Sequence, residues 1–424
     1  MTLNTGFSWQ AEAQPNKKLI PISKTKLRAL GLTGDLSKHV NNLEELRESP
    51  PNIIVATAKT NISFVQNYFK NQKLKKKTAY VMGLGVYQQL HRNNIQAGNQ
   101  KILMPSKIKF KNIYRPYRGQ SLEDKTLLVF RTGGIGDLLF IQPNLRYLKE
   151  KYPTCEIRFA CGPQYQAMVE TWDCVDEVLD LPFRLKHLKE SDYHALFEGV
   201  IERCKLAETE NAYNLFSRWL GLDLPNELLI PRQDVKEEKL QFCIDKLNEW
   251  QVTPHKFILL QLRASSPIRS PRPQFWINII DKLTDLGHDV ILTDSPRQAT
   301  HVDDFIKGVK NPHRVFNFCQ HSKSLDYSIA LTKLAQIIVA TDSALTHIAA
   351  SLDVPCYGLF GPFPGHIRLK TYSKAKWIDA VRDCAPCFLH GVNSCPQAGP
   401  DGFSPCYDNL DINQIINDIE EFIK

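Results

Sequence analysis

The stretch from residue 126 to residue 153, TLLVFRTGGIGDLLFIQPNLRYLKEKYP, most constrains how this chain can fold. Its apolar residues 127–130 predict a buried strand, and residues 138–149 carry a helical pattern. Three glycines stand between these two segments: Gly133, Gly134 and Gly136. Glycines at such a junction allow a sharp turn and let a ligand approach the backbone at a helix N-terminus. The stretch therefore predicts a strand–turn–helix unit with a ligand site at the turn.

Asp137 directly follows the last of these glycines. A carboxylate at this place either caps the helix or acts as a base directed into a cleft, and the residues alone leave both roles open. The glycine spacing is not GxGxxG, and no acidic ribose partner is evident downstream.

Strand-like and helical segments alternate along most of the chain. Residues 53–56, 79–82 and 102–104 read as strands, with a helical face predicted at Ile62, Val65 and Phe69. Alternation of this kind predicts right-handed crossovers and a parallel sheet. It resumes after residue 126, and a predicted helix over residues 235–250 links the two halves. We expect an α/β protein with two Rossmann-like domains facing a cleft, divided into residues 1–125 (a basic, partly α/β segment), 126–238 and 239–424.

Polar residues follow two strands of the second half. The first group is Ser265, Ser266 and Arg269; the second is Asp342, Ser343 and His347. Ligands of open parallel sheets bind beyond the carboxyl ends of the strands. Hydroxyls, a guanidinium and helix N–H groups suit a diphosphate, and Asp342 suits a sugar hydroxyl. The alternatives are a capped solvent-facing loop, an N-cap and a buried core histidine. The chain has no DxD pair, so arginine and helix dipoles would have to replace a metal at the diphosphate.

Charge is unevenly distributed along the chain. Residues 1–125 hold 21 Lys/Arg and 7 Asp/Glu, a surplus of 14 positive charges, whereas the rest holds 32 basic and 38 acidic residues. This asymmetry favours a polyanionic partner such as nucleic acid or an anionic glycolipid. The segment also offers possible stacking residues, which are Tyr114, Arg115, Tyr117 and Arg118. The lysine cluster Lys73, Lys75, Lys76 and Lys77 is equally consistent with a solvated loop.

The chain has neither a long apolar run of about 18 residues nor a signal-peptide layout, so we expect a cytoplasmic protein without a transmembrane segment. Seven of its eleven cysteines are scattered, which is typical of reduced thiols. The other four form the pattern Cys384-x2-Cys387-x7-Cys395-x10-Cys406. Four thiolates in this spacing predict a structural zinc or iron site, with free thiols or a disulfide as alternatives.

Three segments together resemble glycosyltransferase family 9, the ADP-heptose:lipopolysaccharide heptosyltransferases. They are TGGIGD with its flanks, RASSPIRSPRPQFW, and DSALTHIAASLDVPCYGLFGP, and the resemblance covers roughly residues 126–410. It implies a two-domain fold of the B type and an inverting, metal-independent transfer of a sugar from an ADP- or UDP-linked donor. By the same resemblance Asp137 matches the general base, and the glycines of its motif line the nucleotide-sugar site.

The resemblance assigns the remaining positions of the donor site as well. Ser265 and Ser266 match paired hydroxyls at the phosphates, and Arg269 stands where the family usually has lysine. Asp342, Ser343 and His347 match the donor loop, with Ala344 in place of a glycine. No acidic residue after Thr293 clearly matches the family's ribose-binding residue. The family's usual acceptor is the lipopolysaccharide core, a modified DNA base is the rival, and a non-catalytic nucleotide- or polyanion-binding protein is the alternative.

Overall fold

The computed structural model describes residues 39–48, 53–58, 62–63, 73–83, 87, 103–106, 110–389 and 395–424. These residues form two compact units, which meet in sequence between Asp234 and Val235. Described residues 39–234 make up the first unit, and residues from Val235 onward the second. The segment before residue 126, which the sequence analysis set apart, contributes its described strands to the first unit.

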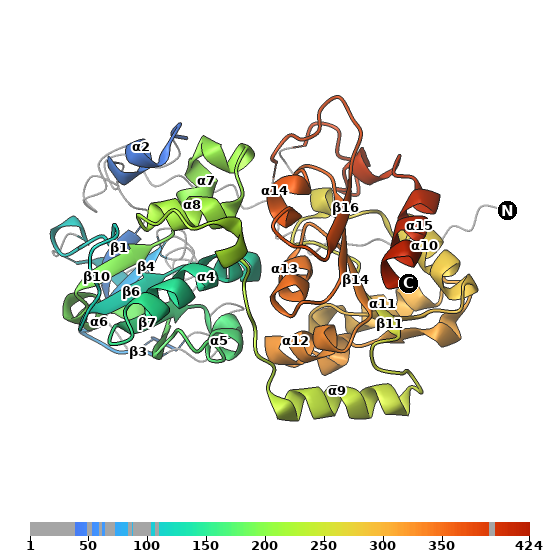
Figure 1. Ribbon diagram of the computed structural model, residues 1–424, viewed down its shortest axis with the longest axis horizontal. Helices are drawn as coiled ribbons and strands as arrows, with labels where there is room; N and C mark the ends of the chain where they lie inside the picture. The colour runs from blue at the N-terminus through green and yellow to red at the C-terminus, as the bar shows by residue number, and fades with distance from the viewer. Residues whose placement is uncertain are drawn as a thin grey trace. The chain divides into compact units, whose positions relative to one another are not determined.

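A four-stranded parallel sheet forms the centre of the first unit (Figure 1), in the order β10-β6-β7-β8. Its strands are β6 (Thr126–Phe130), β7 (Glu156–Cys161), β8 (Glu177–Asp180) and β10 (Tyr193–Leu196). The helices of this unit are α2 (Leu43–Glu48), α4 (Ile135–Lys151), α5 (Pro163–Val169), α6 (Leu185–Glu190), α7 (Val200–Arg203) and α8 (Ala212–Trp219). The strand order reverses between β6 and β10, so the turns after these two strands lie at the sheet's topological switch point.

A second sheet of the first unit is antiparallel, in the order β5-β1-β4-β9. Its strands are β1 (Ile53–Ala58), β4 (Ala79–Gly83), β5 (Leu103–Pro105) and β9 (Phe183–Arg184). The pairing differs from the parallel arrangement predicted from the alternation, because the chain between β1 and β4 includes the antiparallel pair β2 (Ile62–Ser63) and β3 (Lys73–Leu74). Ile62 is thus in a strand and not on the predicted helical face; Val65 and Phe69 lie outside the described residues.

The second unit contains a six-stranded parallel sheet in the order β13-β12-β11-β14-β15-β16. Its strands are β11 (Phe257–Gln261), β12 (Asp289–Leu292), β13 (Val315–Asn317), β14 (Ile337–Thr341), β15 (Cys356–Phe360) and β16 (Ala375–Asp379). Numbered within the unit, this is the 3-2-1-4-5-6 order of a Rossmann fold, with its switch point between β11 and β14. Both predicted donor turns follow these two strands.

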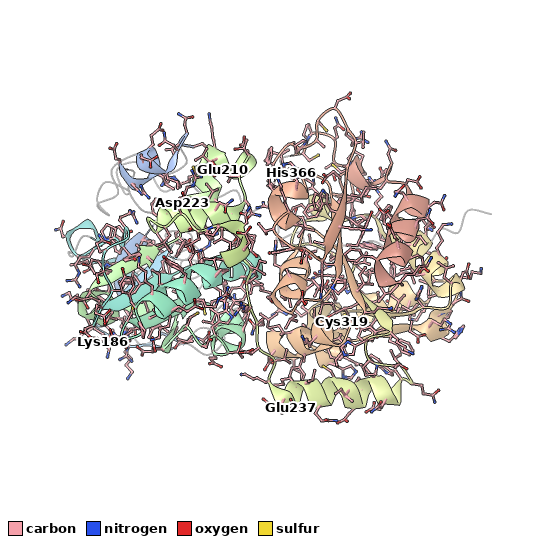
Figure 2. The ribbon with its side chains drawn as sticks, viewed as in Figure 1. Lys186, Glu210, Asp223, Glu237, Cys319 and His366 are labelled. Carbon is pink, nitrogen blue, oxygen red and sulfur yellow. The ribbon has the colours of Figure 1, made fainter. Side chains whose placement is uncertain are left out.

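Helices cover both faces of this sheet (Figure 1). Helices α10 (Pro273–Asp285), α11 (Ala299–Ile306) and α15 (Ile412–Ile423) bury their apolar residues on one face, in a core that also includes Cys406 and Tyr407. Helices α12 (Leu325–Lys333) and α13 (Ala344–Ser351) pack together, and α9 (Glu237–Glu249) packs on α12. Figure 2 labels Glu237, where α9 begins, and His366, where α14 (His366–Leu369) begins. None of the helices that the structure describes is both long and apolar enough to cross a membrane.

Candidate functional site

The turn between β6 and α4 requires a glycine at position 133. A Cβ atom there would lie 2.2 Å from Asp137 Oδ2 and 2.4 Å from Arg131 Nε, whereas a Cβ at Gly134 would meet nothing within 4 Å. Gly134 is the N-cap of α4, and Gly136 lies within its first turn. Because Gly133 has no side chain, Arg131 and Asp137 can meet over the turn.

Asp137 stands at the third position of α4, where its Oδ2 accepts a hydrogen bond from the Gly134 N–H at 3.1 Å. The same oxygen accepts from Arg131 Nη2 at 2.7 Å. Oδ1 makes no hydrogen bond within the part of the chain that the structure describes. The capping role considered for Asp137 is thus present in the structure, and it leaves one carboxylate oxygen available to a ligand.

Arg131 was not singled out from the sequence, yet it is the centre of this turn. Its side chain is 1% exposed and donates to Asp137, to the Phe197 carbonyl at 2.8 Å, and to Glu202 Oε1 at 2.5 Å. Burial lowers the pKa of Arg131, but the carboxylates of Asp137, Glu202 and Glu198 outweigh burial and raise it well above the usual range. The guanidinium is therefore permanently charged, and it fixes Asp137 against β10.

Glu198 is a second carboxylate at the same switch point, two residues beyond the end of β10. Its Oε1 accepts hydrogen bonds from the Thr132 N–H and from the Thr132 hydroxyl, the latter at 2.6 Å. Burial raises the pKa of Glu198, although Arg131 and the bonds from Thr132 oppose that shift. The sequence signal was a glutamate directly after an apolar strand, in ALFEGV, but nothing there shows that β10 pairs with β6.

Two turns of the second unit meet at the switch point between β11 and β14. The first contains Ser265, Ser266 and a short 3-10 helix, Pro267–Arg269. The second contains Asp342 and Ser343, the N-cap of α13. Because β11 and β14 are neighbours, the free N–H groups at the start of α13 open onto the edge of the sheet where the first turn lies.

An ion pair joins the two turns. Arg269 Nη1 lies 3.1 Å from Asp342 Oδ2, and Arg269 Nη2 donates to the Ser265 hydroxyl. Arg368, after β15, lies 3.8 Å from Asp342 Oδ1. Asp342 is only 6% exposed, and burial alone would raise its pKa; the guanidinium groups of Arg368 and Arg269 reverse the shift and lower it. Asp342 is thus ionised and holds Arg269 in place, a role that the sequence analysis did not give it.

The remaining residues predicted to bind the sugar donor differ in their hydrogen bonds. The Ser343 hydroxyl donates to Gln261 Oε1 at 2.8 Å. Ser266 is buried, and its hydroxyl has no hydrogen-bond partner among the described residues. His347 is buried and bonded through Nδ1 to the Tyr372 hydroxyl at 2.9 Å, the arrangement of a core histidine. Ala344 is the first residue of α13.

Asp294 is an acidic residue of this sheet edge that sequence reasoning missed. It directly follows Thr293, beyond the end of β12, and its Oδ2 lies 3.3 Å from Arg263 Nε. Burial raises the pKa of Asp294, while Arg263 and hydrogen bonds from Ser295 oppose the shift. The sequence signal was an aspartate directly after an apolar strand, in ILTDSP.

The rings of Tyr114 and Tyr117 pack against other side chains, which corrects the interpretation of these two tyrosines as stacking residues. Tyr114 stacks on Phe110 and His194, and Tyr117 is buried. Arg118 covers the Trp219 ring, with its guanidinium carbon 4.3 Å from the ring centroid. Arg115 is exposed and donates to the Lys189 carbonyl within α6 at 3.1 Å and to the Ser191 carbonyl that follows it. These side chains join α6, α8 and β10 to the segment before β6, and the two tyrosine rings are not available to stack on a ligand.

All four clustered cysteines are free thiols; Cys384 is exposed and Cys406 is buried. Burial raises the pKa of Cys406, and the charges of Cys387, Cys384 and Cys395 act in the same direction. Within the described residues, which omit 390–394 of this loop, no group of three or more His, Cys, Asp or Glu side chains has the geometry of a metal site. The expected four-thiolate metal centre is therefore not formed in this structure.

Comparisons with known proteins bear on the family and the fold. A sequence profile of glycosyltransferase family 9 (heptosyltransferase) matches residues 198–393. Lipopolysaccharide heptosyltransferase 2 of Escherichia coli (strain K12) is 20% identical over 293 residues, which cover 56% of this chain and 82% of the relative. The match confirms the resemblance that the three sequence segments indicated.

Two solved structures share the fold. The E. coli ADP-heptose lps heptosyltransferase II superposes with a TM-score of 0.54 at 16% identity, covering 70% of this chain and 98% of that chain. The iron-containing dodecameric glycosyltransferase TibC from enterotoxigenic E. coli H10407 gives a TM-score of 0.50 at 13% identity, covering 88% of this chain and 93% of its own. The α/β architecture with two parallel sheets is thus that of the B-type glycosyltransferases.

Proposed function

We propose that this glycosyltransferase of the family 9 type binds a nucleoside-diphosphate sugar at the switch point of the six-stranded sheet and transfers the sugar to an acceptor hydroxyl. The observation that carries the proposal is the convergence of Ser265, Arg269 and Asp342 with the N-terminus of α13 at that point. The E. coli relative is described as an ADP-heptose enzyme, so an ADP-linked heptose is the donor that we propose to test first.

The donor diphosphate would be held by charge and by backbone N–H groups. Arg269 supplies a guanidinium, and α13 supplies its positive N-terminal end, both of which stabilise the negative charge that develops on the leaving diphosphate. The unpartnered Ser266 hydroxyl adds a donor in the same turn. Asp294, at the end of β12, would accept hydrogen bonds from the ribose hydroxyls. In this proposal the leaving group needs no metal ion.

Asp137 is the proposed general base. Its free Oδ1 would take the proton of the acceptor hydroxyl as that oxygen attacks the anomeric carbon, on the face opposite the leaving diphosphate, and the transfer would invert the anomeric configuration. Arg131 would keep the carboxylate oriented by holding Oδ2.

Removing Arg269 or Asp342 tests the donor site. Arg269→Ala and, separately, Asp342→Ala should each weaken ADP-heptose binding by roughly 1.5–3 kcal/mol, since each loses a hydrogen bond to a charged group or the arginine's orientation. Arg314→Ala is the matched control, because Arg314 pairs with Asp289 at 2.9 Å at the opposite end of β12. Titration calorimetry showing wild-type affinity in both test variants would place the donor elsewhere.

The acceptor that we propose is polyanionic, on the strength of the 14 surplus positive charges of residues 1–125. Lys75, Lys76 and Lys77 lie on an exposed turn between β3 and β4. Binding of an anionic glycolipid or of DNA should then fall steeply with salt, by several log units per log unit of concentration. Replacing Lys73, Lys75, Lys76 and Lys77 with glutamine should make binding depend less steeply on salt concentration. Binding that is independent of salt would exclude a polyanionic acceptor. Sugar transfer to only one of the two, the glycolipid or DNA, would identify the acceptor.

We also propose that Cys384, Cys387, Cys395 and Cys406 hold one structural zinc or iron ion. The proposal rests on the sequence spacing of the four cysteines and on thiolates being preferred ligands of both metals. A metal would tie the loop containing residues 390–394 to the core at Cys406. Elemental analysis of freshly purified protein should find about one equivalent, which Cys384→Ser should lose together with thermal stability. Metal-free wild-type protein would contradict this proposal.

A further inference from the structure

The C-terminal segment from Cys395 to Asp408 packs directly on the donor turns of the second unit. The Ser404 hydroxyl donates to the Ile268 carbonyl at 2.8 Å, and Ser404 is only 2% exposed. Arg272, just after the first donor turn, pairs with Asp401 at 3.2 Å and with Asp408 at 2.6 Å. These contacts join residues more than 120 positions apart in the sequence, so the turn that carries Arg269 is supported by this segment.

Tyr407 is a residue of this segment with a buried polar group that lacks a hydrogen-bond partner. Its side chain is 1% exposed, and its hydroxyl has no hydrogen-bond partner among the described residues. The hydroxyl lies beside the backbone at the end of β15, since a Cβ built on Gly361 would be 3.0 Å from it. Gly361 follows β15 and Asp342 follows β14, and these two parallel strands are neighbours, so the hydroxyl and Asp342 lie at the same edge of the sheet. A buried hydroxyl without a partner costs free energy, so its position at this edge calls for a partner in another state of the site.

We infer that Tyr407 is a positioning residue of the donor site, whose hydroxyl donates to the Asp342 carboxylate when the diphosphate takes over Arg269. In the present structure Arg269 donates to Asp342 Oδ2, and Arg368 lies farther away, at 3.8 Å from Oδ1. A diphosphate draws the Arg269 guanidinium toward itself, because two phosphate charges attract it more strongly than one carboxylate. Asp342 is then a buried carboxylate that has lost its nearest donor, and Tyr407 replaces it.

This inference rests on the proposed donor site and explains how that site exchanges partners without leaving a buried charge unsatisfied. It also gives the consecutive residues Cys406 and Tyr407 separate roles: the thiol belongs to the cysteine cluster, and the phenol belongs to the donor site. Ser404 and Tyr407 together make the C-terminal segment a part of the donor site.

Tyr407→Phe tests the inference by removing one oxygen atom. Calorimetric titration with ADP should show about tenfold weaker binding, the effect of losing one hydrogen bond to a charged group. The KM for the sugar donor should rise by a similar factor, while kcat at saturating donor stays within about twofold of the wild type. The ligand-free variant should be as stable as the wild type, because the lost hydroxyl has no partner there.

Tyr357→Phe is the matched control. Its hydroxyl is also buried in the second unit, but it donates to Asp418 Oδ2 of α15 at 2.6 Å, away from the donor turns. The control should lose stability and retain ADP affinity, the reverse of Tyr407→Phe. Ser404→Ala is the second test variant; it removes the bond to Ile268 and should also weaken ADP binding.

The possible results distinguish a failure of the proposed donor site from a failure of the role inferred for Tyr407. Wild-type protein that fails to bind ADP would overturn the proposed donor site and the inference with it. Wild-type protein that binds ADP, together with a Tyr407→Phe variant of equal affinity, would overturn the inference alone. Reduced stability of ligand-free Tyr407→Phe with unchanged KM would show a purely structural role and would also contradict it.

Discussion

Asp137→Asn is expected to reduce sugar transfer by 10²–10⁴-fold, the usual contribution of a general base. Asparagine keeps the length of the side chain and can still accept the Gly134 N–H bond through its oxygen, so α4 keeps its cap. It cannot take a proton from the acceptor. Donor affinity should be almost unchanged, because the donor turns belong to the other unit. Single-turnover transfer assays and ADP titration measure the two effects separately.

Asp176→Asn provides the control for this experiment. Asp176 also accepts a backbone N–H, that of Ile157 at 2.7 Å, and also pairs with a cation, Lys149 at 2.8 Å. It precedes β8, at the amino end of the parallel sheet, away from the switch point. This variant should transfer sugar at nearly the wild-type rate. Near-normal turnover of Asp137→Asn would remove Asp137 from the mechanism and leave it only as a helix cap.

Arg131→Met is expected to lower the free energy of unfolding of the first unit by about 3–5 kcal/mol and to abolish transfer. The substitution keeps the apolar bulk but removes the buried cation that faces Asp137, whose side chain is only 19% exposed, and the partly buried Glu198. Urea unfolding measures the loss of stability. Arg158→Met is the control in the same sheet; the side chains of its partners Glu156 and Glu177 are 42% and 44% exposed, so its loss should stay below about 1 kcal/mol.

The decrease in the free energy of unfolding caused by Arg131→Met should depend on pH. Arg131 opposes the effect of burial on Glu198, so without the guanidinium the folded-state pKa of Glu198 rises further above its usual value. A carboxyl with a raised folded-state pKa loses stability as pH increases through that pKa. The difference between variant and wild type should therefore be smaller at pH 5 than at pH 8. A difference that is constant across this range would show that Arg131 acts through packing and not through its charge.

The local sequence was sufficient to predict the strand–turn–helix units and the residues at their turns. The apolar run before Gly133 and the helical pattern after it correspond to β6 and α4. The predicted helix over residues 235–250 corresponds to α9. These features depend on neighbours within a few residues, and periodicity records such neighbours directly.

Features that depend on pairing between distant strands could not be predicted in the same way. Glu198 belongs with Thr132 because β10 lies beside β6, although the two residues are 66 positions apart. Arg368 reaches Asp342 from beyond β15. The alternation in residues 53–104 matched that of parallel strands, but β2 pairs with β3, and β1 pairs with β4, in antiparallel register. Register and neighbour order follow from packing, which a single sequence does not record.

The cysteines of this protein differ in exposure and in thiol pKa, so a thiol reagent can label one position selectively. Burial raises the pKa of the Cys155 thiol to about 11 and of the Cys161 and Cys243 thiols to about 12, so these side chains alkylate slowly at neutral pH. Cys384 is exposed. A maleimide fluorophore added in substoichiometric amount to metal-free protein would therefore attach first at Cys384, which follows β16, and its emission would report on changes around that residue as substrates are added.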